Sequence, residues 1–431
     1  MMLEKIYHAF LQCNGLIGTD TRTIAKGCMF FALKGANFNG NQFANQALGA
    51  GAKFVVIDEP VLMGDHVFLV DDVLTTLQQL ARHHRRQLKT RIIAITGSNG
   101  KTTTKELLHN VLGSTYNTLA TRGNLNNHIG VPLTLLQLTP VHDMAIVEMG
   151  ANHQGEIASY CDIAEPDFGL INNVGKAHLE GFGGFEGVIK GKTELYRFLQ
   201  LHNRVIFCNA ANPHLAPILA SYTNTVWYNS WQSISGQCRQ PGLYLQVEWQ
   251  AANTPGINYI DTRLTGAYNF ENIMAAIAIG KYFSIPAEKI NAAIASYVPD
   301  NARSQVIERG SNKIIMDAYN ANPTSMRHAI ENFNQKFDNN KIVALGDMYE
   351  LGQDEDAEHL AIISLLGECN LEEVILVGSR FAKHRDKISA QFFDNSKQAR
   401  DYLQQKKYSH SHFLIKGSRS SKMELVLEGI L

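Results

Sequence analysis

The apolar residues of the chain gather in short runs that alternate with amphipathic segments. Runs with the length and β-branched content of buried strands occur at residues 29–33, 53–58, 91–96, 145–148, 168–172, 204–209, 313–319, 341–348, 373–378 and 412–416. Segments with helical periodicity occur at residues 41–52, 101–112, 269–282, 323–333, 354–367 and 420–429, and another follows Pro286. Strands that alternate with helices predict an α/β protein whose sheets are largely parallel.

Two stretches interrupt this alternation. Residues 82–91 are the most basic run, which we interpret as a solvated connector or the end of a helix. Residues 222–265 combine Trp, Tyr and Gly with short alternating pieces, which predicts an antiparallel appendage. A length of 431 residues, at roughly 150 residues per domain, indicates about three domains. We place them at residues 1–86, 87–300 and 301–431, the last being a second doubly wound α/β unit.

The composition narrows the class of protein. Lys and Arg number 39 and Asp and Glu number 40, so no overall field favours a nucleic-acid partner. No stretch approaches the ~20 consecutive apolar residues of a membrane span, and the first residues lack the pattern of a secretory signal. The six cysteines are scattered without a C-x-x-C pair. We therefore expect a cytoplasmic protein with reduced thiols and no membrane span.

A glycine-containing loop between a predicted strand and a predicted helix predicts ATP binding. The loop residues are Gly97, Ser98, Asn99, Gly100, Lys101, Thr102 and Thr103. Backbone N–H groups of such a loop converge on phosphate oxygens, and the helix N-terminus adds partial positive charge. Lys101 is suited to the β- and γ-phosphates and the Thr102 hydroxyl to Mg²⁺. Ile95 stands where the usual pattern has glycine, so the alternative is a glycine turn with a surface lysine. The loop alone does not name a reaction.

Three further residues are candidates for chemistry. Glu148 ends a predicted strand, at the edge of a parallel sheet where ligands collect, so it is either a Mg²⁺ ligand or an exposed glutamate. His178 is a poor Mg²⁺ ligand by type, and from the sequence alone it is a satisfied loop histidine or a base. Lys192 is by default a solvated helix residue, although nearby cations would lower its pKa enough for a carbamate to form with CO₂.

Several motifs, taken together, resemble the Mur ligase family over nearly the whole chain. They are Asp20–Arg22 with Phe30–Gly35, Thr96–Glu106, Gly123–Pro132, Glu148–Gly150, Asn172–Glu180, Asp317–Pro323, Leu345–Met348 with Glu350–Gly352, and Lys416–Arg419. Asn-Ala-Asn-Pro at 320–323 and the paired asparagines before Ile-Gly-Val-Pro are the most specific for one member over its sister ligases.

The resemblance implies a domain that binds a UDP-sugar, a central ATPase domain with Mg²⁺, and a Rossmann-like domain that closes over the nucleotide. It implies a ligase of peptidoglycan synthesis that joins D-Ala-D-Ala to a UDP-N-acetylmuramoyl-tripeptide through an acyl phosphate. A sister ligase that adds a single amino acid and a non-catalytic ATP-binding protein are the alternatives. A monomer is expected, and the third residue of the tripeptide stays open between diaminopimelate and lysine.

The resemblance also implies roles for individual residues. Lys101 and Thr102 match phosphate and first-metal groups, Glu148 and His178 match ligands of a second Mg²⁺, and Lys192 matches a carbamylated lysine. Asn269 and Asn272 match residues near the adenine, Arg303 a phosphate contact and Asp317 a ribose contact. Asn126, Asn127 and Asn322 match substrate-side positions, and Thr21 and Arg22 part of the UDP-sugar site. Two positions depart from the family pattern, which usually has Glu at His128 and His at Tyr268.

Overall fold

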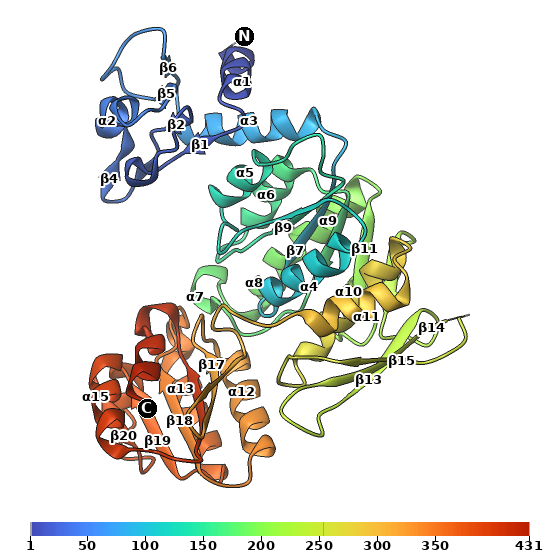
Figure 1. Cartoon of the computed structure of the whole chain (residues 1–431), viewed down its shortest axis with the longest axis vertical. Coiled ribbons are helices and arrows are strands. Elements are labelled where there is room, and N and C mark those ends of the chain that lie inside the picture. The colour runs from blue at the N-terminus through green and yellow to red at the C-terminus, as the bar shows by residue number, and fades with distance from the viewer. Residues whose placement is uncertain (1, 253, 431) are drawn as a thin grey trace.

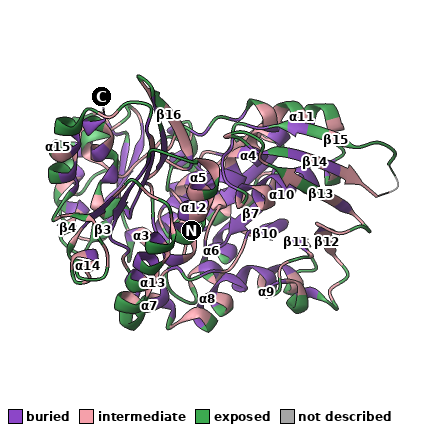
Figure 2. Ribbon diagram, turned by 90° about the horizontal axis from the view of Figure 1, so that it is seen from below, coloured by how far each residue is buried: buried purple, intermediate pink, exposed green. Residues whose placement is uncertain are grey.

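The computed structural model describes residues 2–252 and 254–430, while Met1, Asn253 and Leu431 lie outside the described residues. Figure 1 shows the N-terminal part in blue and the C-terminal part in orange and red at opposite ends of the view, with the central part between them. Each part contains its own sheet with parallel strand pairs. The predicted α/β fold class with three domains is confirmed. Buried residues are concentrated in the strands and exposed residues on the outer helix faces (Figure 2).

The N-terminal part is a four-stranded parallel sheet. In spatial order its strands are β1 (Ile17–Gly18), β2 (Met29–Phe31), β5 (Phe54–Ile57) and β6 (Val67–Leu69). Its helices are α1 (Met2–Gln12), α2 (Ala44–Gly49) and α3 (Val73–Arg86), and β3 (Lys34–Gly35) and β4 (Phe38–Asn39) form a short ribbon. The predicted helix at residues 41–52 starts as a 3₁₀ turn at Gly40–Phe43 and continues as α2.

The basic run at residues 82–91 corresponds to the last turn of α3, so its prediction as a helix end is confirmed. It is not fully solvated, however. Arg82 and Arg86 pair with Glu165 of the central domain, and Arg85 pairs with Asp167 at 2.9 Å. The arginines of this run pair with two carboxylates of the central domain, and these ion pairs connect the N-terminal domain to the central one.

The central sheet is six-stranded and every neighbouring pair is parallel. In spatial order its strands are β12 (Thr225–Tyr228), β11 (Val205–Asn209), β10 (Phe168–Ile171), β7 (Arg91–Thr96), β9 (Met144–Glu148) and β8 (Thr118–Ala120). Its helices are α4 (Lys101–Gly113), α5 (Gly130–Leu135), α6 (Glu156–Ala164), α7 (Leu179–Phe182), α8 (Phe185–Lys192), α9 (Glu194–Leu201), α10 (Asn269–Tyr282) and α11 (Ala287–Ser296). Ile93 and Ile95 of β7 pack on the side of α4 and α10, whereas Ile92 and Ala94 pack on the side of α5 and α6. This alternation places the β7–α4 loop at the carboxyl edge of a sheet covered on both faces.

The prediction for residues 222–265 was partly wrong. Strands β13 (Ile234–Arg239), β14 (Gln246–Ala251) and β15 (Asn258–Asp261) do form an antiparallel appendage. Strand β12 instead pairs in parallel with β11 and extends the central sheet. Its alternating aromatic and β-branched residues indicate a strand, but they do not say which sheet it joins.

The C-terminal sheet has six strands, in the order β16 (Gln305–Arg309), β17 (Asn312–Asp317), β21 (His412–Lys416), β18 (Lys341–Gly346), β19 (Glu373–Val377) and β20 (Gln391–Phe393). Only the β16–β17 pair among these strands is antiparallel. Helices α12 (Pro323–Lys336), α13 (Glu355–Glu368), α14 (Ser379–Ala382) and α15 (Ser396–Lys406) cover the sheet.

The predicted helix at residues 420–429 was wrong in type. The segment forms two 3₁₀ turns, Arg419–Ser421 and Met423–Gly429, separated by Lys422 in the left-handed region at φ 48°. A left-handed residue interrupts an α-helix. The second turn packs so close to α15 that a Cβ at Gly429 would lie 2.4 Å from the Arg400 carbonyl oxygen.

Candidate active site

A cleft of about 930 Å³ lies where the central and C-terminal domains meet. Its central-domain wall includes the β7–α4 loop, the end of β9 and the start of α10, and its other wall comes from residues 303–328 and Lys416. The predicted residues that line it are Ser98, Asn99, Gly100, Lys101, Thr103, Asn126, Asn127, Glu148, His178, Asn269, Asn272, Arg303, Asp317 and Asn322. Residues more than 200 positions apart in the sequence thus meet at the carboxyl ends of two parallel sheets, where α/β proteins bind ligands.

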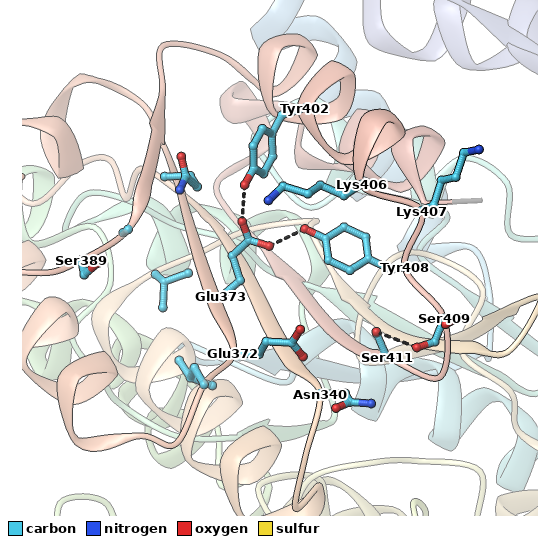
Figure 3. Close-up of a pocket in the computed structure, with 14 residues that line it drawn as sticks. Asn340, Glu372, Glu373, Ser389, Tyr402, Lys406, Lys407, Tyr408, Ser409 and Ser411 are labelled. Atoms are coloured by element: carbon cyan, nitrogen blue, oxygen red, sulfur yellow. Dashed lines mark hydrogen bonds between the residues drawn. The ribbon is translucent and has the colours of Figure 1, made fainter.

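A second hollow, of about 620 Å³, lies at the amino end of the C-terminal sheet (Figure 3). There the Glu373 carboxylate accepts hydrogen bonds from the hydroxyls of Tyr402 and Tyr408. The Glu373 carboxylate is thus already hydrogen-bonded, and no predicted site residue lines this hollow. The cleft between the domains is therefore the candidate site.

The β7–α4 loop has the backbone geometry that phosphate binding needs. Gly97 and Gly100 have φ values of 143° and 78°, and a Cβ at Gly100 would lie 2.3 Å from the Asn272 Oδ1 atom. Glycine is therefore required at Gly100 on both conformational and steric grounds. Helix α4 begins at Lys101, so its unpaired N–H groups lie at the loop.

Lys101 lies over its own loop, where its Nζ donates to the carbonyl oxygens of Gly97 at 2.7 Å and Ser98 at 3.3 Å. Burial lowers the pKa of Lys101 to about 8, an effect opposed by the charge of Glu148 and reinforced by that of Arg303. The alternative of a surface lysine on a glycine turn is inconsistent with this placement.

Asn269 and Asn272 belong to a buried amide network that joins α10 to α4. Asn272 accepts from the Thr104 hydroxyl at 3.1 Å and from the Asn172 amide at 3.0 Å, and donates to Asn269 at 2.9 Å. Asn269 donates in turn to the Thr265 carbonyl at 2.8 Å. The network supports the rear of the phosphate loop from the neighbouring helix.

Glu148 is only 1% exposed, so the alternative of an exposed glutamate at a strand end is excluded. Its two carboxylate oxygens accept from the Thr102 hydroxyl at 2.9 Å and the Asn126 amide at 2.8 Å. A hydroxyl and a carboxylate beside a phosphate loop form an oxygen donor set that suits Mg²⁺. Asn127, next in the chain, accepts from the backbone N–H groups of Ile129 and Gly130 and so shapes the start of α5.

His178 contacts the other domain through its ring. Its Nδ1 atom is hydrogen-bonded to the carboxylate of Glu350, and this hydrogen bond lowers the pKa of Glu350. The backbone of His178 lies in the left-handed region at φ 55°. His178 and Glu148 line the same cleft, so one side chain participates in both the cleft and the domain interface.

Lys192, on the last turn of α8, is 1% exposed, which excludes the alternative of a solvated lysine. Its Nζ donates to the Ala151 carbonyl at 2.9 Å and lies 5.0 Å from the centre of the Phe182 ring. Burial lowers its pKa far below the ordinary value, and the charge of Lys101 lowers it further. The buried amine is therefore poised to be neutral, which is the nucleophilic form.

The C-terminal domain supplies a cation and polar groups. The Arg303 guanidinium lies 3.7 Å from the centre of the Tyr319 ring, and its buried Nε has no hydrogen-bond partner among the described residues. Asp317 is held by Lys416 at 2.6 Å and by the Ser304 N–H at 3.2 Å. A buried donor without a partner is costly unless a ligand supplies the acceptor, so Arg303 fits an anion in the cleft.

Asn322 connects the two walls directly. Its amide donates to Asn99 of the phosphate loop at 2.8 Å, while its Oδ1 atom caps α12 by accepting from the Ser325 N–H at 2.9 Å. Sequence reasoning gave Asn322 a substrate-side position but did not foresee this contact with the loop. It also assigned no role to Glu350, although the Glu-Leu-Gly motif that contains it was apparent.

The four other predicted or divergent positions are Thr21, Arg22, Tyr268 and His128. Thr21 and Arg22 form a 3₁₀ turn in the N-terminal domain, where Arg22 pairs with Asp20, and neither lines the cleft. Tyr268 bonds Ser304 at 2.7 Å through its hydroxyl and stacks on His328, so this departure adds a contact between domains. His128 contributes its carbonyl oxygen to Gln78 of α3 at 3.0 Å.

Fold and cleft together define a three-domain protein with a phosphate loop. Three family models match the chain: "Mur ligase family, catalytic domain" over residues 15–85, "Mur ligase middle domain" over 95–280 and "Mur ligase, glutamate ligase domain" over 302–419. The chain belongs to the Mur ligase family, as the resemblance implied.

Curated relatives and solved structures support the same family. A UDP-N-acetylmuramoyl-tripeptide–D-alanyl-D-alanine ligase from Bacillus subtilis is 34% identical over 96% of this chain and 93% of its own length. The Escherichia coli protein of that name is 33% identical over the same shares. A crystal structure of MurF from Acinetobacter baumannii matches with a TM-score of 0.86 at 31% identity, covering 95% of this chain and 92% of that one. MurF from Thermotoga maritima in complex with ADP matches with a TM-score of 0.85 at 26% identity, covering 96% of both chains.

Proposed function

We propose that this chain is an ATP-dependent ligase that adds D-Ala-D-Ala to UDP-N-acetylmuramoyl-tripeptide, giving the pentapeptide precursor of peptidoglycan in the cytoplasm. The observation that carries the proposal is the convergence of Lys101, Glu148 and Arg303, from two domains, on one cleft. Relatives that bear this activity in their names align over 96% of the chain. We propose that the enzyme acts as a monomer.

Both walls of the cleft carry groups suited to binding the ATP phosphates. Backbone N–H groups of the loop and the N-terminus of α4 meet the phosphate oxygens. Lys101 exchanges its two loop carbonyls for the β- and γ-phosphates, and their negative charge favours the protonated state that burial disfavours. Arg303 offers its unpartnered Nε from the opposite wall. Asn269 and Asn272 lie toward the adenine, and Asp317 toward the ribose.

We assign the first Mg²⁺ to Thr102 and the second to Glu148 and His178. When bound, Mg²⁺ supplies positive charge that offsets the charge building up on the transferred phosphoryl group. The buried Glu148 carboxylate, already oriented by Thr102 and Asn126, is the anionic residue of this set.

In the proposed reaction the protein forms no covalent bond with the reacting groups. A carboxylate oxygen of the tripeptide attacks the γ-phosphorus, ADP leaves, and an acyl phosphate forms. The amine of D-Ala-D-Ala then attacks the acyl carbon, giving a tetrahedral intermediate, from which phosphate leaves and the amine proton is lost. The chain contributes positions and charges, because alignment and neutralisation account for most of the rate in such transfers.

Lys192 contributes as a carbamate. Its neutral amine attacks CO₂, an N–C bond forms and one proton is released, so the neutral amine becomes an anionic carbamate. Burial and the nearby Lys101 charge both favour the neutral amine that this step requires. The resulting carboxylate stands close to the charges around the phosphates.

The tripeptide substrate spans the domains. Thr21 and Arg22 belong to the UDP-sugar end in the N-terminal domain, and Asn126, Asn127 and Asn322 to the reacting end. Asn126 and Asn322 line the cleft near the phosphate loop, which supports their assignment to the reacting end.

A phosphate-release assay tests the proposal. The enzyme is given ATP, Mg²⁺ and UDP-N-acetylmuramoyl-tripeptide that carries either diaminopimelate or lysine as third residue. Release that requires D-Ala-D-Ala supports the proposal. Release only with a single amino acid points to a sister ligase, and ATP binding without amine-dependent release points to a non-catalytic protein. Mass spectrometry of the pentapeptide identifies the product and the preferred third residue.

A further inference from the structure

Glu350 reaches from the C-terminal domain to the segment that contains His178. Its carboxylate is hydrogen-bonded to the His178 Nδ1 atom, and its carbonyl accepts from the Glu180 N–H at 3.2 Å. Gly352 packs so close that a Cβ built on it would lie 3.3 Å from the Glu180 Cβ. The loop after β18 therefore holds the 178–180 segment through both side chain and backbone.

This contact joins two strained residues. His178 and Glu350 both lie in the left-handed region, at φ 55° and 63°, where side chains other than glycine are disfavoured. Such conformations persist only where the surroundings fix them, and they concentrate at functional sites. The arrangement is therefore more than the incidental meeting of two flexible surface residues.

The loop that carries Glu350 is anchored at the two residues where it leaves β18, Asp347 and Met348. Asp347 accepts from the N–H groups of Arg380 at 3.1 Å and Phe381 at 3.0 Å. The Met348 N–H donates to the buried His359 ring at 3.1 Å. The carboxylate of Glu350 is thus presented to His178 from a rigid support.

The hydrogen bond to Glu350 determines which ring nitrogen of His178 carries the proton. An ionised carboxylate can only accept, so the Nδ1 of His178 carries the proton. In a neutral imidazole the lone pair then belongs to Nε2. Metal-binding histidines usually donate their other ring N–H to a carboxylate or carbonyl in this way, which orients the ring and fixes the tautomer.

We propose that Glu350 is a positioning residue that orients His178 for metal binding across the domain interface, so that docking of the C-terminal domain completes the second metal site. The proposal rests on the ligand role of His178 in the proposed function. Because coupling between two events is reciprocal, metal binding in turn favours the docked arrangement.

The test measures metal affinity in the full-length enzyme. Mn²⁺ is titrated by electron paramagnetic resonance in the presence of a non-hydrolysable ATP analogue, alongside the Mg²⁺ dependence of turnover. Glu350→Gly removes the carboxylate and relieves the left-handed strain, so the variant keeps its fold. We expect Mn²⁺ affinity at one site to fall by about 10- to 100-fold. Glu350→Gln, which keeps an acceptor for Nδ1–H, is expected to recover part of that loss.

Glu358→Ala is the matched control. Glu358 is another C-terminal carboxylate that crosses the interface, to Lys176, without touching His178. We expect this variant to keep wild-type Mn²⁺ affinity. An equal loss in Glu358→Ala would show that any weakening of the interface has the effect, and would overturn the proposal.

A double-mutant cycle separates positioning from other effects. If Glu350 acts through His178, the double variant His178→Ala, Glu350→Gly binds Mn²⁺ no more weakly than His178→Ala alone. Additive losses, or wild-type affinity in Glu350→Gly, contradict the proposal. These outcomes are independent of the proposed function, which stands or falls with phosphate release by the wild-type enzyme that depends on D-Ala-D-Ala.

Discussion

The two walls of the cleft are built in different ways. On the central-domain wall, Glu148, Asn269 and Asn272 are each at most 3% exposed and hydrogen-bonded within their own domain. On the C-terminal wall, Asp317 is also held within its own domain, but Asn322 and Ser304 make polar contacts across the interface, to Asn99 and Tyr268. The central wall is therefore preorganised, while the C-terminal wall is complete only when the domains meet.

Backbone strain occurs in both domains. In the C-terminal domain Ala302, Ser304 and Glu350 have φ values of 55°, 52° and 63°, and in the central domain His178 has a φ value of 55°. On the central wall the loop itself uses glycines, Gly97 and Gly100, for its positive φ values. From the difference in polar contacts we expect the central wall to determine binding of the nucleotide and the C-terminal wall to determine alignment. Substitutions on the two walls should then have effects of different size and kind.

The largest effect is expected on the central wall, at Lys101. Lys101→Ala removes the cation that donates to two loop carbonyls and that we propose to bind the phosphates. We expect kcat for phosphate release to fall by on the order of 10²–10³-fold or more. Lys190→Ala, at an exposed lysine, is the control and should retain the wild-type rate. A near-normal rate in Lys101→Ala would remove the loop from the mechanism.

Lys192→Ala should cost on the order of 10²-fold in kcat, because it deletes the carbamate and leaves a cavity. Short carboxylic acids such as acetate fit that cavity and replace the lost carboxylate, so they are expected to restore part of the activity. The measurement is turnover against acid concentration, with the wild type as the reference that acetate does not stimulate. Full activity without added acid would rule out the carbamate.

Glu148→Gln keeps the shape of the side chain and one acceptor for Thr102 but removes the charge. We expect the Mg²⁺ concentration for half-maximal turnover to rise by about 10-fold or more, as for a lost metal-site residue. An unchanged Mg²⁺ dependence would count against the ligand role of Glu148 and against the view of this wall as a preformed metal site.

On the C-terminal wall, Asn322→Ser separates two roles. Serine still caps α12, but its shorter side chain no longer reaches Asn99 across the interface. Loss of one hydrogen bond, about 1 kcal/mol, predicts about a fivefold change in KM for ATP with an unchanged melting temperature. A drop in melting temperature would mean that the cap, and not the interface, was affected.

The smallest expected effect is on stability. Burial lowers the pKa of the unmodified Lys192 below its ordinary value of 10.5. At a pH between the lowered pKa and 10.5, Lys192 is therefore protonated in the unfolded chain but neutral in the folded chain. Lys192 therefore destabilises the fold at pH 7, and the penalty disappears above pH 10.5. Lys192→Met should raise the melting temperature at pH 7 by roughly 2–4 °C, and by less at higher pH. A gain that does not shrink with pH would have another origin.

Local pattern was sufficient for much of the fold. The strand at 91–96, the helix at 269–282 and the strand at 412–416 have the predicted bounds, because each is a continuous buried or amphipathic run. Predictions were wrong where partners decide the outcome. Strand β12 joins the central sheet through β11, and residues 419–429 form 3₁₀ turns against α15.

The sequence by itself determined the α/β class, the phosphate loop and the acid at the end of β9, because these depend on spacing within one segment. Its motifs also indicated the family. Only the tertiary structure decided that Lys192 and Glu148 are buried, that Arg303 has an unpartnered Nε, and that Glu350 contacts His178. The contacts that set burial and charge in the cleft join residues from 22 positions apart (Asn126 and Glu148) to 223 positions apart (Asn99 and Asn322). A pattern within one segment does not show which side chain from another segment will exclude the water.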